Sequence, residues 1–121
     1  MKEVLDLYFQ AWRTQDSDLI ASLFTGDGIY RVKPFGIEEY LGRDQIKDYW
    51  YANPVSGQSK PTPELLNYAF GDNVCFAEWQ NHFVSLKHQL DITTKGILLL
   101  EFENGLIKEL REHYLSDKKP F

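Results

Sequence analysis

The chain has 121 residues, the size of one domain that buries about two-thirds of the surface of its unfolded chain. Its formal charge is −5 and no cluster of Lys and Arg occurs, which argues against a nucleic-acid partner. A single cysteine excludes an internal disulfide, and the longest apolar run, GILLL, is too short to span a membrane. Since Glu3 and Asp6 interrupt the first apolar run, we expect no signal peptide but one cytoplasmic domain over residues 1–121.

Helical patterns come first along the chain. The apolar residues of KEVLDLYFQAW recur at helical spacing and predict a helix over about residues 2–15. The stretch QDSDLIASLF predicts a second helix, with Asp16 or Ser17 as its N-cap. Gly26 and Gly28 then break the pattern, so we expect TGDG to form a turn.

The middle of the chain predicts one strand, one helix and one long loop. The alternating stretch IYRVK ends at Pro34 and predicts a short edge strand, and GRDQIKDYWY predicts a helix. The segment Ala52–Pro63 has no apolar period and holds three of the five prolines. We expect it to be a mobile loop and a lid over a pocket.

The second half of the chain changes to strand patterns. Three runs, ELLNYAF, VCFAEWQNHFVSL and LDITTKGILLLEF, predict three strands, with the turn GDN between the first two. The stretch FENGLIKELREHYL is ambiguous, because its apolar residues fit a helical stripe as well as strand alternation. The Asn-Gly pair is a strong hairpin signal and favours a strand over Leu106–Leu115 near the centre of the sheet. Helices followed by an antiparallel meander predict an α+β fold.

Four groups of residues follow one another along most of the chain: YFQAWRTQDSDLIASLFTGDGIYRV, then PFG with GRDQIKDYW, then AEW, then GILLLEFENGLIKELREHYL. In this order they resemble the SnoaL-like branch of the nuclear transport factor two superfamily. The resemblance implies a curved antiparallel sheet wrapped around the N-terminal helices, which forms a cone-shaped barrel with an internal pocket. It also implies a homodimer through the outer sheet face, where Val74, Phe76 or Leu99 would expose an apolar patch. The fold alone does not fix the chemistry, because it hosts isomerases, dehydratases, epoxide hydrolases, cyclases and non-catalytic modules.

The ketosteroid isomerases give the most specific comparison. They need a tyrosine on the first helix, a protonated aspartate that holds an oxyanion, and a second aspartate as base. Tyr8 matches the tyrosine, but the base position holds Lys33, or Val32 if the strand carries an insertion, and the oxyanion acid falls on Leu98. The resemblance therefore does not imply isomerase chemistry of that type. The sequence also lacks the Asp-Arg-Asp set of the epoxide hydrolases and the paired histidines of scytalone dehydratase.

The same alignment implies that one carboxylate, Glu112, faces the pocket. Burial among rings should raise its pKa above about 4.3, so that it can act as a general acid or base. The alternatives are that Glu112 pairs with Arg31, Lys33 or Arg111, or that it lies at a wet cavity mouth. Asn81 either holds a substrate carbonyl or orients Glu112, or it binds a water.

We therefore expect Glu112, Tyr8 and Asn81 to be the catalytic group. The residues expected to contact the ligand are mainly aromatic, and their rings fit a core as well as a binding site: Trp12, Tyr30, Val32, Trp50, Trp79, Phe83, Leu98, Leu110 and Tyr114.

No metal or organic cofactor is expected. His82, His88 and His113 lack metal-ligand spacing and are interpreted as surface or dimer-interface residues, and Cys75 as a small buried hydrophobe. The leading hypothesis is a protein that encloses a small apolar or aromatic molecule and acts on it by acid/base chemistry. A non-catalytic ligand-binding module and an interaction domain that uses the outer sheet face stay open as alternatives.

Overall fold

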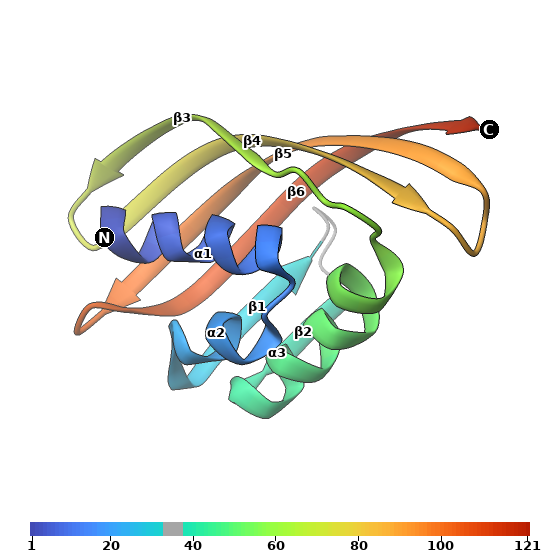
Figure 1. Cartoon of the computed structure of the whole chain (residues 1–121). Helices are drawn as coiled ribbons and strands as arrows, with labels where there is room; N and C mark the ends of the chain where they lie inside the picture. The colour runs from blue at the N-terminus through green and yellow to red at the C-terminus, as the bar shows by residue number, and fades with distance from the viewer. Residues whose placement is uncertain (33–37) are drawn as a thin grey trace.

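The computed structural model describes residues 1–32 and 38–121, with the helices early in the chain and most of the sheet late (Figure 1). The helical elements are α1 (Lys2–Thr14), α2 (Ser17–Ser22), α3 (Gly42–Trp50) and a π-helix, η1 (Tyr51–Val55). The strands are β1 (Phe24–Val32), β2 (Glu38–Leu41), β3 (Glu64–Gly71), β4 (Val74–Ser85), β5 (Leu90–Glu103) and β6 (Leu106–Pro120). No helix within these ranges is long and apolar enough to cross a membrane.

The strands form one curved sheet in the order β2-β1-β6-β5-β4-β3, and the α+β class is confirmed. The sheet is open, with β2 and β3 at its two edges. It is mixed rather than antiparallel throughout, because β1 runs parallel to β6 while the other neighbours are antiparallel. A parallel pair needs a long crossover, and here α3 and the whole β3–β5 meander lie between the two strands in the chain.

The ambiguous stretch FENGLIKELREHYL is a β-hairpin, as predicted, and β6 occupies a central position in the sheet. Asn104 and Gly105 both have positive φ, 52° and 82°, which is the backbone that a type I′ turn requires. The strand continues to Pro120, past the predicted end at Leu115, because it pairs with β5 as far as Leu90.

The helices cover the concave face of the sheet, and Figure 1 shows α1 lying across it. The helix α1 buries Leu5, Tyr8, Phe9, Ala11 and Trp12, the stripe that its periodicity predicted. It ends where Gln15 adopts a left-handed conformation. Asp16 is the N-cap of α2, since its side chain accepts the backbone N–H of Leu19 at 3.0 Å.

Two predictions for the segment after α2 were wrong. The stretch TGDG is not a separate turn but part of β1, where the pairing with β6 shifts register between Phe24 and Ile29. Strand β1 is not an edge strand, because β2, which the sequence reading missed, pairs along its other side. Pro34 and Lys33 lie outside the described residues.

The predicted loop Ala52–Pro63 is helical at its start, where η1 continues α3. Pro54 has no N–H to donate, which interrupts the α-helical hydrogen-bond ladder and suits the wider π-helical turn. Two side chains bond the local carbonyls instead: Asn53 Nδ2 donates to Tyr49 O at 2.9 Å, and Ser56 Oγ to Tyr51 O at 2.6 Å. The rest of the segment crosses over to β3 (Figure 1).

Candidate functional site

Strand register arranges the inner face of the sheet in rows. Because alternate residues of a strand share a face, each row takes one residue from β4, one from β5 and one from β6. The four rows that reach the cavity described below are, from the inside outward, Ala77–Leu98–Glu112, Trp79–Gly96–Tyr114, Asn81–Thr94–Ser116 and Phe83–Ile92–Lys118. The rows therefore change from apolar with one carboxyl, through rings and small polar groups, to a lysine at the rim.

These rows, the end of α1, α3 and the segment after it enclose a cavity of about 460 Å³. That volume suits a small organic ligand, and all three tryptophans of the chain line it. The lining is Trp12, Tyr30, Tyr49, Trp50, Ala52, Asn53, Pro54, Gly57, Gln58, Trp79, Asn81, Phe83, Lys87, His88, Ile92, Thr94, Glu112, Tyr114, Ser116 and Lys118.

Glu112 faces this cavity and is 6% exposed. The hydroxyl of Tyr30 donates a hydrogen bond to its Oε2 at 2.5 Å. Burial raises the pKa of Glu112 from its usual value of 4.5 to about 7, against the smaller lowering effect of the Tyr30 hydrogen bond. The shift has the direction that the sequence predicted. A carboxyl group with this pKa is present in both protonation states near neutral pH, so it can donate or accept a proton.

The arginines proposed as partners of Glu112 bind other carboxylates. Arg31 pairs with Glu39 at 3.0 Å and with Glu109 at 2.9 Å. Arg111 contacts Glu109 and lies 3.7 Å from Glu101. Both arginines point to the outer face of the sheet, whereas Glu112 points to the inner face. Neither is therefore placed to stabilise the buried charge of Glu112. Lys33, the third proposed partner, falls outside the residues that the structure describes.

Tyr30, the hydrogen-bond donor to Glu112, is also buried in the cavity wall. It is 1% exposed, and burial together with the Glu112 carboxylate raises the pKa of its hydroxyl well above the usual value. Its ring centroid lies 5.3 Å from that of Tyr49 and 6.2 Å from that of Trp50, both of which line the cavity. The hydroxyl therefore stays protonated at any physiological pH and acts as a hydrogen-bond donor to Glu112.

Some predicted site residues lie behind the cavity wall. Tyr8 is fully buried on α1, packs edge-on against Trp50 at 5.5 Å, and does not line the cavity. Its hydroxyl has no hydrogen bond of standard geometry among the described residues; burial and the Glu112 carboxylate raise its pKa, and the nearby Tyr30 hydroxyl lowers it. Val32, Leu98 and Leu110 are likewise buried in the core rather than placed in the lining. The other predicted contact residues all border the cavity: Trp12, Tyr30, Trp50, Trp79, Phe83 and Tyr114.

Asn81 borders the cavity and is held by a residue that the sequence reading missed. Its Nδ2 donates to Gln58 Oε1 at 3.1 Å, and Trp12 Nε1 donates to the same oxygen at 2.9 Å. Gln58 is held in turn, because Gln15 Nε2 donates to its carbonyl at 2.6 Å and to the carbonyls of Pro54 and Val55 at 3.1 Å. The predicted lid segment therefore does contact the pocket, and α1 anchors it there.

Three buried polar atoms of the wall have no protein partner among the described residues: the indole nitrogens of Trp50 and Trp79 and the Oδ1 of Asn81. Buried polar groups are costly when they lack a hydrogen bond. All three side chains border the cavity, so these unpaired donors and this acceptor lie within its wall, as the carboxyl group does.

The middle of the wall depends on a glycine in β5. A Cβ on Gly96 would come within 2.4 Å of the His113 carbonyl and 2.7 Å of the Trp79 ring. The missing side chain lets the Trp79 ring lie over the strand, with its centroid 6.4 Å from that of Tyr114. Strand alternation could have flagged Gly96 and Thr94 as inward-facing, since both share the parity of Leu98.

The remaining chemistry-bearing residues do not gather into a second centre. Across residues 1–32 and 38–121, no group of His, Cys, Asp and Glu is placed to hold a metal ion. His82 and His113 are exposed on the outer sheet face, with His82 against Asp91, whereas His88 is exposed but also borders the cavity. Cys75 is buried, as predicted.

Solved structures share this fold at low sequence identity. One is a hypothetical protein with a ketosteroid isomerase-like fold from Catenulispora acidiphila, in complex with trimethylamine (17% identity, 93% of this chain and 85% of that one, TM-score 0.83). Another is a candidate SnoaL-like polyketide cyclase from Shewanella putrefaciens (15%, 93% and 88%, TM-score 0.79). A third is an epoxide hydrolase of the LEH type from M. tuberculosis (12%, 93% and 80%, TM-score 0.75). At these identities the likeness shows the fold alone.

No curated protein matches the chain in sequence. The sequence profile of the SnoaL-like domain does match, over residues 5–110, which is most of the chain but stops short of Glu112. The chain therefore belongs to the SnoaL-like domain family.

Proposed function

We propose that this protein is an enzyme that encloses an apolar or aromatic small molecule and transfers protons to and from it with Glu112. The observation that carries the proposal is the buried carboxyl group at the deep end of the cavity, whose pKa of about 7 suits acid/base work at neutral pH. The wall of aromatic rings supports an apolar or aromatic ligand.

The reaction class that fits is isomerisation, cyclisation or hydration without a cofactor. In an isomerisation, ionised Glu112 takes a proton from a carbon next to a carbonyl group and returns it at another carbon, so the enzyme ends unchanged. The Tyr30 hydroxyl orients the carboxyl group throughout. In this proposal the unpaired indole N–H groups of Trp50 and Trp79, which lie within the wall, turn toward the ligand and donate to the oxygen that gains charge.

Structural relatives of this fold include a candidate polyketide cyclase and an epoxide hydrolase, which supports the same reaction classes. Within the described lining, Glu112 is the only carboxylate and no arginine is present. The three-residue set of the epoxide hydrolases is therefore not reproduced here. For that reason we favour single-acid proton transfer over attack by a water held between two carboxylates.

Hydrogen exchange from a carbon acid tests the proposal directly. The bicyclic ketones tetralone and indanone are incubated in heavy water, and the loss of their α-proton NMR signals is followed with and without protein. We expect the wild-type protein to accelerate the exchange and Glu112→Gln to be slower by about a hundredfold or more, the usual contribution of a general base. Glu78→Gln is the matched control, because Glu78 is exposed on the outer face of β4. Unchanged exchange in Glu112→Gln would rule out Glu112 as the base.

A ligand-binding module without catalysis is the second candidate. The observation in its favour is that the two aspartate positions of the ketosteroid isomerases have no counterpart among the described residues, since Leu98 stands at one of them. The indole ¹⁵N–H signals of the tryptophans distinguish the candidates, because all three rings line the cavity. If the ketones shift these signals but the α-protons of the ketones do not exchange faster, the binding module is favoured.

A further inference from the structure

A second cavity continues from the rim of the first. It is a groove of about 680 Å³ lined by Arg13, Gln15, Ala52, Ser56, Gly57, Gln58, Ser59, Lys60, Pro61, Val84, Ser85, Leu86, Lys87 and His88. The two cavities share Ala52, Gly57, Gln58, Lys87 and His88. The two cavities therefore adjoin at the segment after η1 and the β4–β5 turn.

The charges at this opening are of one sign. Among the described residues, the two cavities are lined by four of the thirteen Lys and Arg but by one of the eighteen Asp and Glu, the deep Glu112. The basic residues are Arg13, Lys60, Lys87 and Lys118, and His88 adds a charge when protonated. In a chain of net charge −5, an entrance with only basic groups is a local reversal of sign, and such a field draws in anions.

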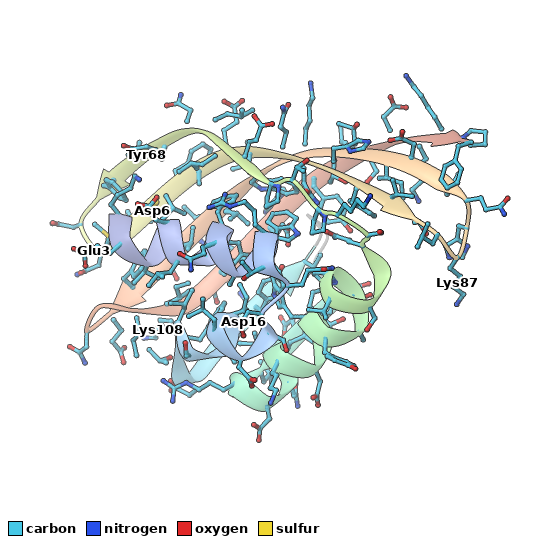
Figure 2. The ribbon with its side chains drawn as sticks, viewed as in Figure 1. Glu3, Asp6, Asp16, Tyr68, Lys87 and Lys108 are labelled. Carbon is cyan, nitrogen blue, oxygen red and sulfur yellow. The ribbon has the colours of Figure 1, made fainter. Side chains whose placement is uncertain are left out.

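The four basic residues at the opening form no ion pairs in the described part of the chain. The salt bridges there involve other Lys and Arg residues, and none includes Arg13, Lys60, Lys87 or Lys118. Figure 2 shows Lys87 at the tip of the β4–β5 turn, with its side chain on the side of the sheet where α3 lies. Lys118 shares the inner-face row of Phe83 and Ile92.

The distance between the rim and the carboxyl group follows from their positions on β6. Lys118 follows Glu112 by six residues on the same face of β6, a Cα separation of about 20 Å at the usual rise of a strand. The two side chains shorten the gap that a ligand must bridge. Two-thirds of the way along it from Glu112 lies the row of Asn81, Thr94 and Ser116, whose Thr94 and Ser116 hydroxyl groups are 3.5 Å apart.

We propose that the ligand is elongated and carries an anionic group, which binds at Lys87 and Lys118 while its apolar end reaches Glu112. The shared chemistry is a carboxylate or phosphate ester at the far end of a ring system, either as part of a free acid or on a phosphate-bearing carrier. This inference takes from the proposed function only the identity of the reacting end of the ligand. The rim would bind the anion with or without catalysis.

Three probes with one ring system test the rim: naphthylbutyrate, its neutral methyl ester, and naphthyl phosphate. Binding is measured by shifts of the tryptophan indole ¹⁵N–H signals. We expect at least one anion to bind more tightly than the ester, and a rise in salt to weaken the anion but not the ester. Preference for naphthyl phosphate indicates a phosphate-bearing ligand, and preference for naphthylbutyrate a free acid; either supports the rim site.

Variants then locate the preference. Replacement of one partly exposed charge partner costs up to about fivefold, so Lys87→Ala/Lys118→Ala should weaken the preferred anion about tenfold or more and leave the ester unchanged. Lys119→Ala is the matched control, since it removes the same charge from the opposite face of β6, where Lys119 pairs in register with Asp91. An ester that binds as well as both anions, a double variant that keeps the preference, or no binding of any probe would overturn the rim site. Loss of exchange activity in Glu112→Gln bears on the proposed function alone, so the two can fail separately.

Discussion

The Tyr30 hydroxyl and the Glu112 carboxyl come from parallel neighbouring strands and meet at 2.5 Å, although the two residues are 82 positions apart in the chain. Tyr30 is the only described side chain that donates a hydrogen bond to this carboxyl group. Two opposed effects therefore set the pKa of Glu112: burial raises it and Tyr30 lowers it.

Replacement of Tyr30 by Phe should raise the pKa of Glu112 above its value of about 7, because the hydrogen bond that favours the charged form is lost. The side-chain carboxyl ¹³C shift of Glu112, followed against pH, measures this. Tyr51→Phe serves as a control, because Tyr51 is exposed and lies outside the cavity lining. A pKa that falls in Tyr30→Phe would show that the hydroxyl does not act as the donor.

Glu112 should make the protein less stable as pH rises. Its pKa is higher in the folded state, so the folded state binds more protons between about pH 4.5 and pH 7, and the free energy of unfolding declines across that window. The shift corresponds to about 3 kcal/mol, present below the window and lost above it. Relative to wild type, Glu112→Gln should gain about this amount between pH 5 and pH 8 in urea unfolding. A difference that stays constant with pH would contradict the buried ionisation.

Gly96→Ala should destabilise the protein by about 1–3 kcal/mol, because the new methyl group overlaps the His113 carbonyl and the Trp79 ring. Urea unfolding measures the loss. The indole signal of Trp79 should shift more than those of Trp12 and Trp50, since the methyl group displaces its ring. Gly26→Ala is the control, because a Cβ there meets nothing within 4 Å.

Gln15→Ala should loosen the segment that covers the pocket, since one side chain supplies its bonds to Pro54, Val55 and Gln58. At about 1 kcal/mol for a typical bond, loss of a single bond should accelerate amide hydrogen exchange at Ser59 by about fivefold, and loss of more than one bond by more. Ser59 is the reporter because its backbone N–H donates to Val84 O and its carbonyl accepts the N–H of Val84. Gln10→Ala, on the exposed face of α1, should leave that rate unchanged. The mobility of this lid, expected from the sequence, stays a prediction that the same experiment measures in the wild type.

The outer sheet face should form a homodimer. Phe76, opposite Leu99 in the register, is 45% exposed, and Ile97 beside them is 38% exposed. Light scattering at micromolar concentration should give twice the chain mass of 14.2 kDa, and Phe76→Ser should shift it to the monomer. Leu41→Ser, at an exposed apolar residue on β2, is the control. A wild-type monomer would contradict the prediction.

The sequence was informative where the pattern is local. The Asn-Gly turn identified β6, alternation put Glu112 on one face with Leu110 and Tyr114, and the family resemblance implied that this face is the inner one. The burial of Glu112 and the sign of its pKa shift could therefore be predicted. The partner of Glu112 could not. The candidate cations Arg31 and Arg111 form ion pairs with other carboxylates, Glu39, Glu101 and Glu109. The residue that does bond Glu112 is Tyr30, on the parallel strand β1, and no hairpin signal in the sequence predicts that pairing.

Residues without periodicity were also missed. Gln58 lies in a stretch of Pro, Gly and Ser, where no repeat indicates which side chain points inward, yet it accepts from both Trp12 and Asn81. Lys118 was missed because the predicted strand ended at Leu115. Parity carried on from Tyr114 would have placed it on the inner face, while its neighbour Lys119 faces outward.

The parallel pairing of β1 with β6 also bears on how the protein folds. The meander from β3 to β6 joins neighbours in the chain through short turns, so it can form from local contacts, whereas β1 must find a strand near the other end. Contacts of such long sequence separation form slowly. During synthesis Tyr30 emerges long before β6 exists, and its strand waits without that neighbour. A chain in which only the meander had formed would hold Glu112 without its donor, so the environment of the acid depends on a contact that local pairing does not supply.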